Sequence, residues 1–398
     1  MGRRRKILTV FGTRPEAIKV APLIRELERR MCAFQTVNVS SGQHRHLLQP
    51  LIVMFRLRVD YDLDVHQHDQ QHDDVSRMVI RRILPILKYE SPDLVLVQGD
   101  TSTAVGAAAA ACLIRIPVGH VEAGLRSGDE TKPFPEEIHR KRITAMATYH
   151  FAPTWNNRWN LLSEGIPDSR IFVTGNTIVD SLEKVLAKDN ACSGVDSILA
   201  ETAGLKRIVL TMHRRENIPQ FEPAFLALRR FVDANQDFCI VFPMHPNPAV
   251  RRAAEVLRGA ARIWLLEPLG YSEFIHLLRQ AWIVITDSGG IQEEAPTLGK
   301  TVLLFRAKTE RPEAVATGLV KVGGDSPGTL LQAVEKLKVS GLSRISSPSK
   351  ANPFGNGSSA RAIVNIVESL WEGLYEPVDK TLFQPAQCSG TNIGATSF

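Results

Sequence analysis

The chain contains 398 residues, of which 44% are hydrophobic and 23% charged; this predicts two folded domains and excludes a disordered or fibrous protein. Lys and Arg outnumber Asp and Glu by 48 to 42, giving a formal net charge of +6, which suits anionic small ligands as well as nucleic acid. Because aromatic residues make up only 7% and the basic residues outside 3–6 are scattered, we do not expect nucleic-acid binding.

In the first half of the chain, short apolar runs alternate with amphipathic segments. The predicted strands are KILTVF, QTVNVS, LVLVQGD, VGHVEAG, HFAP and IFVTGN, and the predicted helices lie over 17–30, near 46 and over 101–114. Strands that end in Gly, Asp or Thr and lead directly into helices are typical of a parallel, doubly wound sheet. Ligands of such a sheet bind at the carboxyl ends of its strands.

The second half repeats this pattern after a polar segment, 177–206, which we interpret as a linker. The later predicted strands are RIVLTMH, FCIVFPMHP, RIWLLEP, WIVITDSGG and TVLLFRA. We therefore predict two Rossmann-like domains, 1–176 and 207–355, that face each other across a cleft.

Helices are predicted near 329–338 and over 358–371, the second inside a separate segment, 356–378. The last residues, 379–398, are rich in Ser, Thr, Gly, Gln and Asn, and we expect a flexible tail there.

The cysteines and apolar runs bear on where the protein works. Five widely spaced cysteines disfavour a disulfide framework and form no CxxC metal site. The N-terminal apolar stretch is too short for a signal peptide, and the longest run of small apolar residues, 105–114, falls short of the roughly 20 residues of a membrane span. We expect a soluble cytoplasmic protein without a membrane segment.

The segment DSGGIQEE joins a predicted strand to a helix that starts near Ile291. The amides of Ser288, Gly289 and Gly290 are suited to binding phosphate at that helix N-terminus. Glu294 follows one helical turn later, where its carboxylate can hold the two hydroxyls of a ribose. Taken alone, the SGG sequence also fits an ordinary tight turn, so it is the combination that predicts a nucleotide site.

The first loop, FGTRPEAIK, supplies Arg14 and Lys19. Guanidinium and ammonium groups both bind phosphate, although a solvated helix start is an equally good interpretation. The loop contains no GxGxxG motif, so no dinucleotide cofactor is predicted.

Acidic residues end successive predicted strands of the first half or follow them: Asp100, Glu122 and Glu136. Carboxylates gathered in one cleft can remove and return protons on different faces of a sugar. Two ordinary roles stay open, namely a helix N-cap for Asp100 and a first-turn acid for Glu136.

His213 and His245 each end a predicted strand of the second half. An imidazole there can donate to a leaving phosphate or transfer a proton, while a purely structural histidine is the simpler reading of each one. No HExxH or CxxH spacing occurs, so we predict no metal site.

The order and spacing of these motifs resemble those of the non-hydrolysing UDP-N-acetylglucosamine 2-epimerases, over residues 6 to about 374. The matching strings are FGTRPEAIKVAPLI, SGQHRHLL, VQGD, GHVEAGLRSGD, PFPEE, GNTIVDSL, LTMHRREN, DSGGIQEEAPTLGK and TERPEAVATG. The resemblance implies a glycosyltransferase-B-like fold whose C-terminal helix crosses back to the first domain. It also implies a cytoplasmic homodimer that makes UDP-N-acetylmannosamine for surface polysaccharide.

The family's mechanism, elimination of UDP to 2-acetamidoglucal followed by re-addition, needs no cofactor. The resemblance implies that the catalytic residues are Asp100, Glu122, Glu136 and His213. It implies that substrate and UDP contacts are made by Arg14, Phe274, Ser288, Gly289, Gly290, Glu294 and Arg311, to which the residue patterns add Lys19 and His245.

Many bacterial members are activated by a second UDP-N-acetylglucosamine molecule, and Gln43 and His44 match that regulatory site. The chain departs from the family at His139, where Asn is common, and at Ala307, where Asp is usual. His139 lies one helical turn beyond Glu136 and can either modify it or face outward. A 2-epimerase for a UDP-2,3-diacetamido uronic acid and a retaining glycosyltransferase of the same architecture stay open as alternatives.

Overall fold

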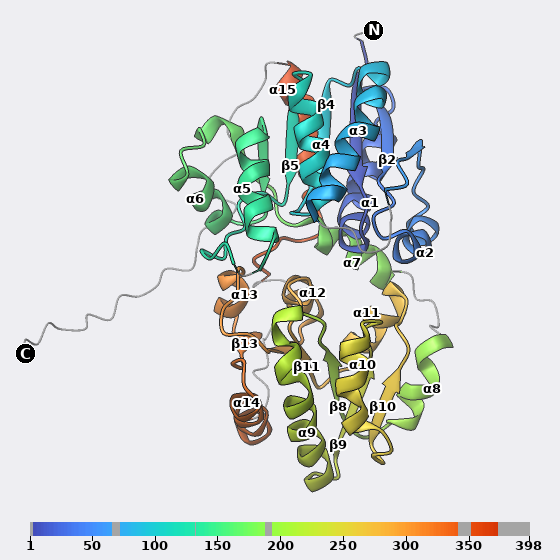
Figure 1. Cartoon of the computed structure of the whole chain (residues 1–398), viewed down its shortest axis with the longest axis vertical. Coiled ribbons are helices and arrows are strands. Elements are labelled where there is room, and N and C mark those ends of the chain that lie inside the picture. Colours follow the sequence, from blue (N-terminus) through green and yellow to red (C-terminus); the bar gives the residue numbers. More distant parts are fainter. Residues whose placement is uncertain (1–2, 66–71, 132, 188–192, 341–351, 373–398) are drawn as a thin grey trace, which may run out of the picture.

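A computed structural model of the chain describes residues 3–65, 72–131, 133–187, 193–340 and 352–372. Two sheets, each with helices around it, lie one above the other in Figure 1, and the chain passes from the upper to the lower domain through the green helix α7. The predicted tail, 379–398, lies outside the described residues.

The upper, N-terminal domain contains a seven-stranded parallel sheet in the order β3-β2-β1-β4-β5-β6-β7. Its strands are β1 (Arg5–Phe11), β2 (Phe34–Ser40), β3 (Tyr61–Asp62), β4 (Leu94–Gln98), β5 (Val118–Val121), β6 (Tyr149–Ala152) and β7 (Ile171–Val173). Its helices are α1 (Arg14–Arg29), α2 (Arg45–Phe55), α3 (His72–Glu90), α4 (Ser102–Leu113), α5 (Glu136–Met146) and α6 (Trp155–Ser163). All residues of β4 are buried, as expected for a parallel strand covered on both faces.

The small residues of α4 allow close helix packing. A Cβ on Gly106 would lie only 2.7 Å from the carbonyl oxygen of Ser76 and 2.8 Å from the Cβ of Val79, both on α3. A larger residue would push the two helices apart. The run that sequence reasoning excluded as a membrane span is therefore a buried helix, and among the described residues no helix is long and apolar enough to cross a membrane.

The lower, C-terminal domain contains a six-stranded parallel sheet in the order β10-β9-β8-β11-β12-β13. Its strands are β8 (Lys206–Thr211), β9 (Phe238–Pro243), β10 (Ile263–Leu266), β11 (Ile283–Thr286), β12 (Thr301–Leu304) and β13 (Val320–Val322). Its helices are α9 (Ile218–Ala234), α10 (Pro248–Ala254), α11 (Tyr271–Arg279), α12 (Ile291–Leu298), α13 (Pro312–Ala316) and α14 (Pro327–Ser340). The predicted pair of doubly wound domains is confirmed.

The segment 177–206, predicted as a polar linker, is mostly helical. It forms α7 (Thr177–Ala187) and α8 (Ser193–Glu201) before β8 begins. Along α7, Ile178, Val179 and Leu182 are buried, and their spacing places them on one helix face. Sequence reasoning missed these helices because lysines, aspartates and glycines surround that apolar stripe.

The last described helix, α15 (Ser359–Glu372), returns to the N-terminal domain. Its residues Ile363, Val364 and Val367 belong to the same buried cluster as Ile7 and Leu23, and in Figure 1 the red helix lies beside the upper sheet. The predicted crossover helix is therefore confirmed. Shortly before α15, Asn352 donates to Thr297 Oγ1 of α12 at 2.8 Å, so this part of the chain joins the two domains a second time.

Candidate active site

The SGG turn lies between β11 and α12, as predicted. The amide of Ser288 donates to Thr286 Oγ1 at 3.0 Å, whereas the amides of Gly289 and Gly290 have no acceptor among the described residues. Exposed amides at a helix N-terminus attract anions. This edge of the C-terminal sheet can therefore bind phosphate.

Asp287, fully buried beside this turn, orders the neighbouring loop. Its carboxylate accepts from the amides of His213, at 3.0 Å, and Arg214, at 2.9 Å, and from Asn217 Nδ2 at 3.3 Å. The ring of His213 stacks on that of His245 with centroids 5.3 Å apart. Both predicted histidines therefore lie at the carboxyl edge of the same sheet.

Burial favours the neutral form of both rings. It lowers the pKa of His213, against the opposing effect of Asp287, and it lowers the pKa of His245 to about 4, with a further contribution from His213. Arg14 on α1 is close enough to add to both effects. The first turn of α1 thus approaches the histidines from the other domain.

Glu294, predicted to bind ribose, is buried next to Tyr271. Tyr271, on α11, donates its hydroxyl to Glu294 Oε1 at 2.9 Å. Burial raises the pKa of Glu294 to about 7, while the Tyr271 hydrogen bond and Arg14 act in the opposite direction. Phe274, one helical turn beyond Tyr271, is half-buried against the adjoining apolar cluster.

A group of buried charges, which we call the interdomain ion cluster, connects the two domains. Lys19 Nζ contacts Glu122 Oε2 and lies 2.9 Å from Glu293 Oε2. Arg311 Nε donates to Glu293 Oε1 at 2.6 Å, and Arg311 Nη1 donates to Glu310 Oε1 at 2.5 Å. All five residues are at most 8% exposed. Lys19 and Arg311, predicted to bind substrate, are thus already paired with carboxylates.

Glu122 is held from several sides, and it adopts a left-handed backbone conformation with φ 69°. Besides Lys19, its Oε2 accepts from Gln98 Nε2 at 2.8 Å and from Asn176 Nδ2 at 3.4 Å. Its Oε1 lies 3.9 Å from Arg311 Nη2. Burial raises the pKa of Glu122, although Lys19 opposes this.

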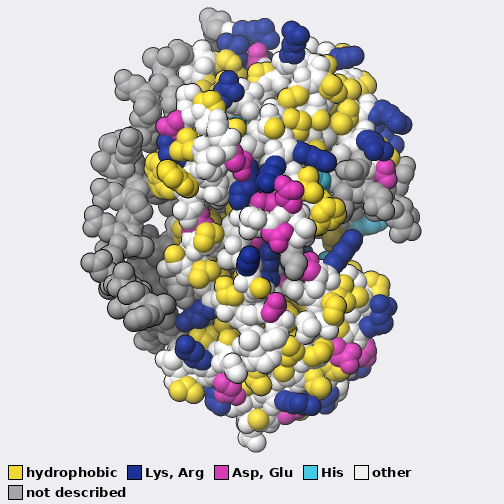
Figure 2. All heavy atoms as spheres, turned by 60° about the vertical axis from the view of Figure 1, so that its left-hand side comes forward, with side chains coloured by type: hydrophobic (Ala, Val, Ile, Leu, Met, Phe, Trp, Pro, Cys, Tyr) yellow, Lys and Arg dark blue, Asp and Glu magenta, His cyan; other side chains and the backbone are white. Residues whose placement is uncertain are grey.

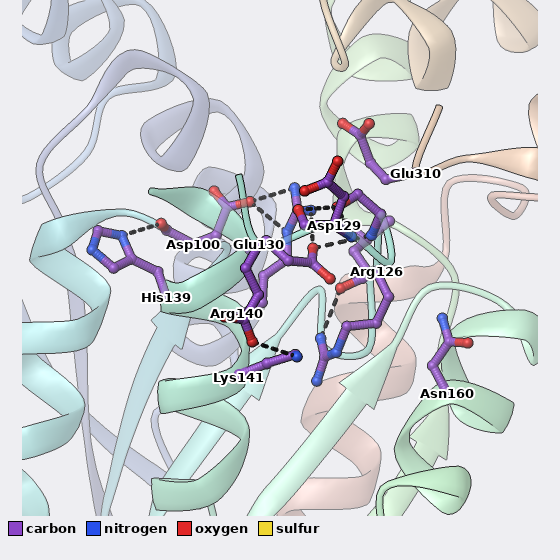
Figure 3. A network of polar contacts seen from close by, with 12 residues as sticks. Asp100, Arg126, Asp129, Glu130, His139, Arg140, Lys141, Asn160 and Glu310 are labelled. Atoms are coloured by element: carbon purple, nitrogen blue, oxygen red, sulfur yellow. Dashed lines mark hydrogen bonds and ion pairs between the residues drawn. The ribbon is translucent and has the colours of Figure 1, made fainter. Parts of the chain in front are cut away.

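Asp100 lies in the turn after β4 and is held by α5 (Figure 3). Arg140 donates to Asp100 Oδ2 from Nε at 2.8 Å and from Nη2 at 2.7 Å. Burial acts to raise the pKa of Asp100, but Arg140, together with the more distant charges of Lys19 and Arg311, outweighs it and the net shift is downward. The helix N-cap interpretation of Asp100 is wrong, because Thr101 caps α4 by accepting from the Ala104 amide.

Glu136, the first residue of α5, is half-buried and differs electrostatically from Asp100. Its Oε2 has no hydrogen-bond partner in the part of the chain that the structure describes. Burial and the charge of Asp100 both raise the pKa of Glu136. The two predicted acids therefore differ in the direction of their pKa shifts, a property of groups that act as base and acid at one site.

His139 is 2% exposed, so an outward-facing histidine is wrong. Its Nδ1 lies 2.8 Å from the Asp100 carbonyl oxygen and is the protonated nitrogen, because a carbonyl only accepts. Ala307, the other departure from the family, is exposed.

The candidate regulatory residues border the same region. Gln43 Oε1 accepts from Thr103 Oγ1 at 2.8 Å, and the His44 amide donates to the Gly12 carbonyl at 3.0 Å. His44 is also close enough to influence the pKa of His245 in the other domain. Both residues thus lie on the N-terminal side of the cleft.

The two domains form a common rim around this site. A pocket between α6 and the loop before α13 is lined by residues of both domains, among them Arg126, Asn160, Thr309 and Glu313. Figure 2 shows side chains of both charges gathered where the halves meet, and a hollow between the halves. Among the described residues, no group of acidic, histidine and cysteine side chains could hold a metal ion.

Sequence reasoning missed several residues that organise this site, chiefly Arg140, Tyr271, Asp287, Glu293 and Glu310. Glu293 and Glu310 stand inside the quoted motifs, next to Glu294 and Arg311. A signal was available, because adjacent charged residues in a motif that reads as buried need partners of opposite charge. Which partners they take is decided only by the fold.

Replacing Gly289 with alanine should damage the SGG turn. The added Cβ would lie 2.7 Å from Arg311 Nη1 and 3.1 Å from Glu310 Oε1, and the guanidinium is fixed between carboxylates. We expect a loss of about 1–3 kcal/mol in the free energy of unfolding together with weaker UDP binding, measured by urea denaturation and calorimetry. The control is Gly328→Ala, where no atom lies within 4 Å of the new Cβ; equal behaviour of the two variants would contradict this packing.

Comparisons with known proteins agree with this geometry. A family model described as UDP-N-acetylglucosamine 2-epimerase matches residues 25–368. A UDP-N-acetylglucosamine 2-epimerase of Salmonella typhimurium is 44% identical over 376 residues, covering 92% of this chain and 98% of that relative. A crystal structure of the Neisseria meningitidis UDP-GlcNAc 2-epimerase bound to UDP-GlcNAc has a TM-score of 0.83 at 37% identity, covering 91% of this chain and 99% of that chain. A Rickettsia africae glycosyltransferase, 12% identical with a TM-score of 0.56, shares the fold alone.

Proposed function

Because the chain belongs to the UDP-N-acetylglucosamine 2-epimerase family, a family of isomerases, we propose that it interconverts UDP-N-acetylglucosamine and UDP-N-acetylmannosamine by inversion at C2. The observation that carries this proposal is a turn with exposed amides on one domain together with two carboxyl groups on the other whose pKa values shift in opposite directions. We further propose that the product supplies surface polysaccharide.

In this proposal the C-terminal domain binds UDP. Glu294 accepts the ribose hydroxyls beside Tyr271, and Phe274 lines the same pocket. The amides of Gly289 and Gly290 bind the diphosphate together with Ser288, and Arg14 approaches from α1. His213, with His245 stacked on it, supplies a neutral imidazole next to the phosphates.

The chemistry explains why the anion site and the acids must be close together. The hydrogen at C2 is not acidic in the intact sugar, because no carbonyl group adjoins C2. When the bond from C1 to the UDP oxygen breaks, positive charge grows at C1 and acidifies that hydrogen. Groups that stabilise the departing UDP therefore lower the barrier to both events. UDP and 2-acetamidoglucal then stay bound until a proton arrives on the opposite face.

Proton NMR of a reaction in D₂O tests this function, with UDP-N-acetylglucosamine as the only substrate. We expect UDP-N-acetylmannosamine whose C2 carries deuterium, because the hydrogen delivered to the opposite face of C2 comes from an acidic group that exchanges with the solvent. An epimer without deuterium at C2 would count against elimination, and the absence of any epimer would overturn the proposed activity. A parallel reaction with the UDP-2,3-diacetamido uronic acid decides between the two sugars, and no acceptor is added, so glycosyl transfer cannot produce the epimer.

UDP affinity should depend on pH through Glu294. Burial raises the pKa of this carboxyl to about 7, and a ribose bound to the carboxylate favours the ionised form. As the pH falls below 7, the dissociation constant of UDP should therefore rise, approaching about tenfold per pH unit. Calorimetry between pH 5 and 8 measures this, and Glu294→Gln should lose the dependence; since both proteins bind the same UDP, ionisation of UDP itself cancels in the comparison.

Regulation and assembly belong to the proposal as well. We propose that a second UDP-N-acetylglucosamine binds at Gln43 and His44, since His44 acts across the cleft on His245. Hyperbolic velocity curves, together with epimerisation of UDP-N-acetylmannosamine in the complete absence of the other epimer, would remove this activation. A homodimer and a cytoplasmic location remain predictions from the family resemblance.

A further inference from the structure

We propose that Arg140 is a positioning residue that holds Asp100 as the proton acceptor at C2, with Oδ1 as the accepting oxygen and Glu136 as the proton donor. The inference rests on the proposed epimerase activity and assigns separate roles to its acids. It starts from the way in which consecutive residues of α5 hold the turn that follows β4.

The first step is the geometry at Asp100. Both Arg140 contacts, at 2.8 and 2.7 Å, reach the same oxygen, Oδ2. Within the described residues, Asp100 Oδ1 has no hydrogen-bond partner, and the Asp100 side chain is 24% exposed. One oxygen is therefore fixed and the other is left available in the cleft. A guanidinium that donates two N–H groups fixes orientation as well as charge.

The second step is the anchoring of the guanidinium itself. Arg140 Nη1 donates to Glu137 Oε2 at 3.0 Å, and the same oxygen accepts from the Ser127 amide at 3.0 Å. Arg140 is 4% exposed, so it has little freedom to move. The preceding residue, His139, binds the Asp100 carbonyl at 2.8 Å. Neighbouring residues of one helix therefore hold both the peptide and the carboxylate of Asp100 (Figure 3).

The third step compares the candidate bases. Glu122 Oε2 contacts Lys19, Gln98 and Asn176, and its Oε1 faces Arg311 at 3.9 Å. A carboxylate with cations or amides on both oxygens is poorly placed to accept a proton from carbon. Asp100 has one open oxygen, and so the structure selects it over Glu122.

The fourth step is the partner acid. Glu136 begins the helix that carries His139 and Arg140, so its position relative to Asp100 is set by one rigid element. The buried Oε2 of Glu136 is unpartnered among the described residues, and burial with the charge of Asp100 raises its pKa. The charges that act on Asp100 from the other elements are Lys19 on α1 and Arg311 before α13, which both favour its ionised form.

The protons and electron pairs of both steps balance without any added reagent. In elimination, the C2 proton moves to Asp100 Oδ1, its bonding pair forms the C1–C2 double bond, and the C1–O bond breaks with its pair going to the UDP oxygen. In re-addition, the proton of Glu136 moves to the opposite face of C2, the double-bond pair forms the new C–H bond, and the UDP oxygen gives a pair to C1. Proton exchange with water then restores both carboxyl groups.

The test compares Arg140→Gln, Arg140→Lys and the control Lys141→Gln by the pH profile of kcat/KM and by the KM for UDP-N-acetylglucosamine. Lys141 is the next residue of α5 and forms an ion pair with Glu130 in which both side chains are about half exposed. Removing the guanidinium should raise the pKa of Asp100, so the acidic limb of the profile should move to higher pH. We expect kcat of Arg140→Gln to fall roughly 100-fold with KM changed less than about threefold, Arg140→Lys to lie between, and Lys141→Gln to match the wild type.

Arg140→Lys keeps the buried positive charge and carries the test if Arg140→Gln does not fold, with UDP affinity as the check of folding. The inference is overturned if a variant that binds UDP normally keeps the wild-type kcat and acidic limb. It is equally overturned if kcat and KM change together with no shift of that limb, since this is the result of a merely structural role. If the wild-type protein forms no epimer at all, the proposed function fails instead, so the two failures are distinguishable.

Discussion

Asp100→Asn is expected to lower kcat for epimerisation by about 10³-fold, while the affinity for UDP changes little. Asparagine has the same shape and its amide oxygen can still accept from Arg140, but it cannot take a proton from carbon. The UDP contacts proposed here lie on the other domain and on α1, so binding should survive. Kinetics followed by NMR and calorimetry with UDP measure the two quantities separately.

Two further variants show whether the loss of kcat is specific to Asp100. Asp237→Asn removes a carboxylate from the surface ion pair with Lys206 and should keep wild-type activity. Glu122→Gln should mainly reduce stability. The two cations beside it lose an opposite charge, and the two amides that donate to it lose a charged acceptor. If Asp100→Asn retained more than about a tenth of the wild-type kcat, its role as a proton acceptor would be wrong.

Arg311→Met is expected to lower the free energy of unfolding by about 3–5 kcal/mol. The guanidinium lies 2.6 Å from Glu293, 2.5 Å from Glu310 and 3.9 Å from Glu122, so its removal leaves buried carboxylates without their main partner. Urea denaturation at pH 7 measures the loss. Arg251→Met is the control, because the pair of Arg251 with Glu267 is open to solvent and its loss should leave the unfolding midpoint unchanged.

The pH dependence gives this prediction a second readout. Burial acts to raise the pKa of Glu293 and of Glu310, but the surrounding cations, of which Arg311 acts most strongly on each, overcome it and both shifts are downward. A carboxyl whose folded pKa is depressed stabilises the fold above its unfolded pKa and loses that contribution as the pH falls. The difference between the wild type and Arg311→Met should therefore narrow on acidification through the ordinary value of 4.5. A difference that is constant with pH would show that lost packing, rather than lost charge, destabilises the variant.

The sequence by itself determined the architecture and the strand ends at which the predicted site residues lie. Buried strands ending in VQGD, HVEAG or TDSGG can only deliver those ends to the carboxyl edge of a parallel sheet, so Asp100, Glu122 and Ser288 come to the edges that meet. The start of α1 was predicted at residue 17 but lies at Arg14, because Thr13 and Glu16 form a capping box around Pro15. A helix over 358–371 was predicted as well, and the family resemblance implied that it packs on the first domain, as α15 does.

Only the tertiary structure decided which charges meet. Lys19 and Glu293 are separated by most of the chain, and yet Lys19 Nζ lies 2.9 Å from Glu293 Oε2. Arg140 forms its hydrogen bond with Asp100, 40 positions earlier. No local period or motif encodes such a pair, because the free energy of a buried charge depends on its surroundings in space rather than on its neighbours in sequence. Local pattern thus brought the acids and the SGG turn to the carboxyl ends of the two sheets. Three-dimensional packing then bound Asp100 to Arg140, shifted the pKa values of Asp100 and Glu136 in opposite directions and placed Glu122 in the interdomain ion cluster.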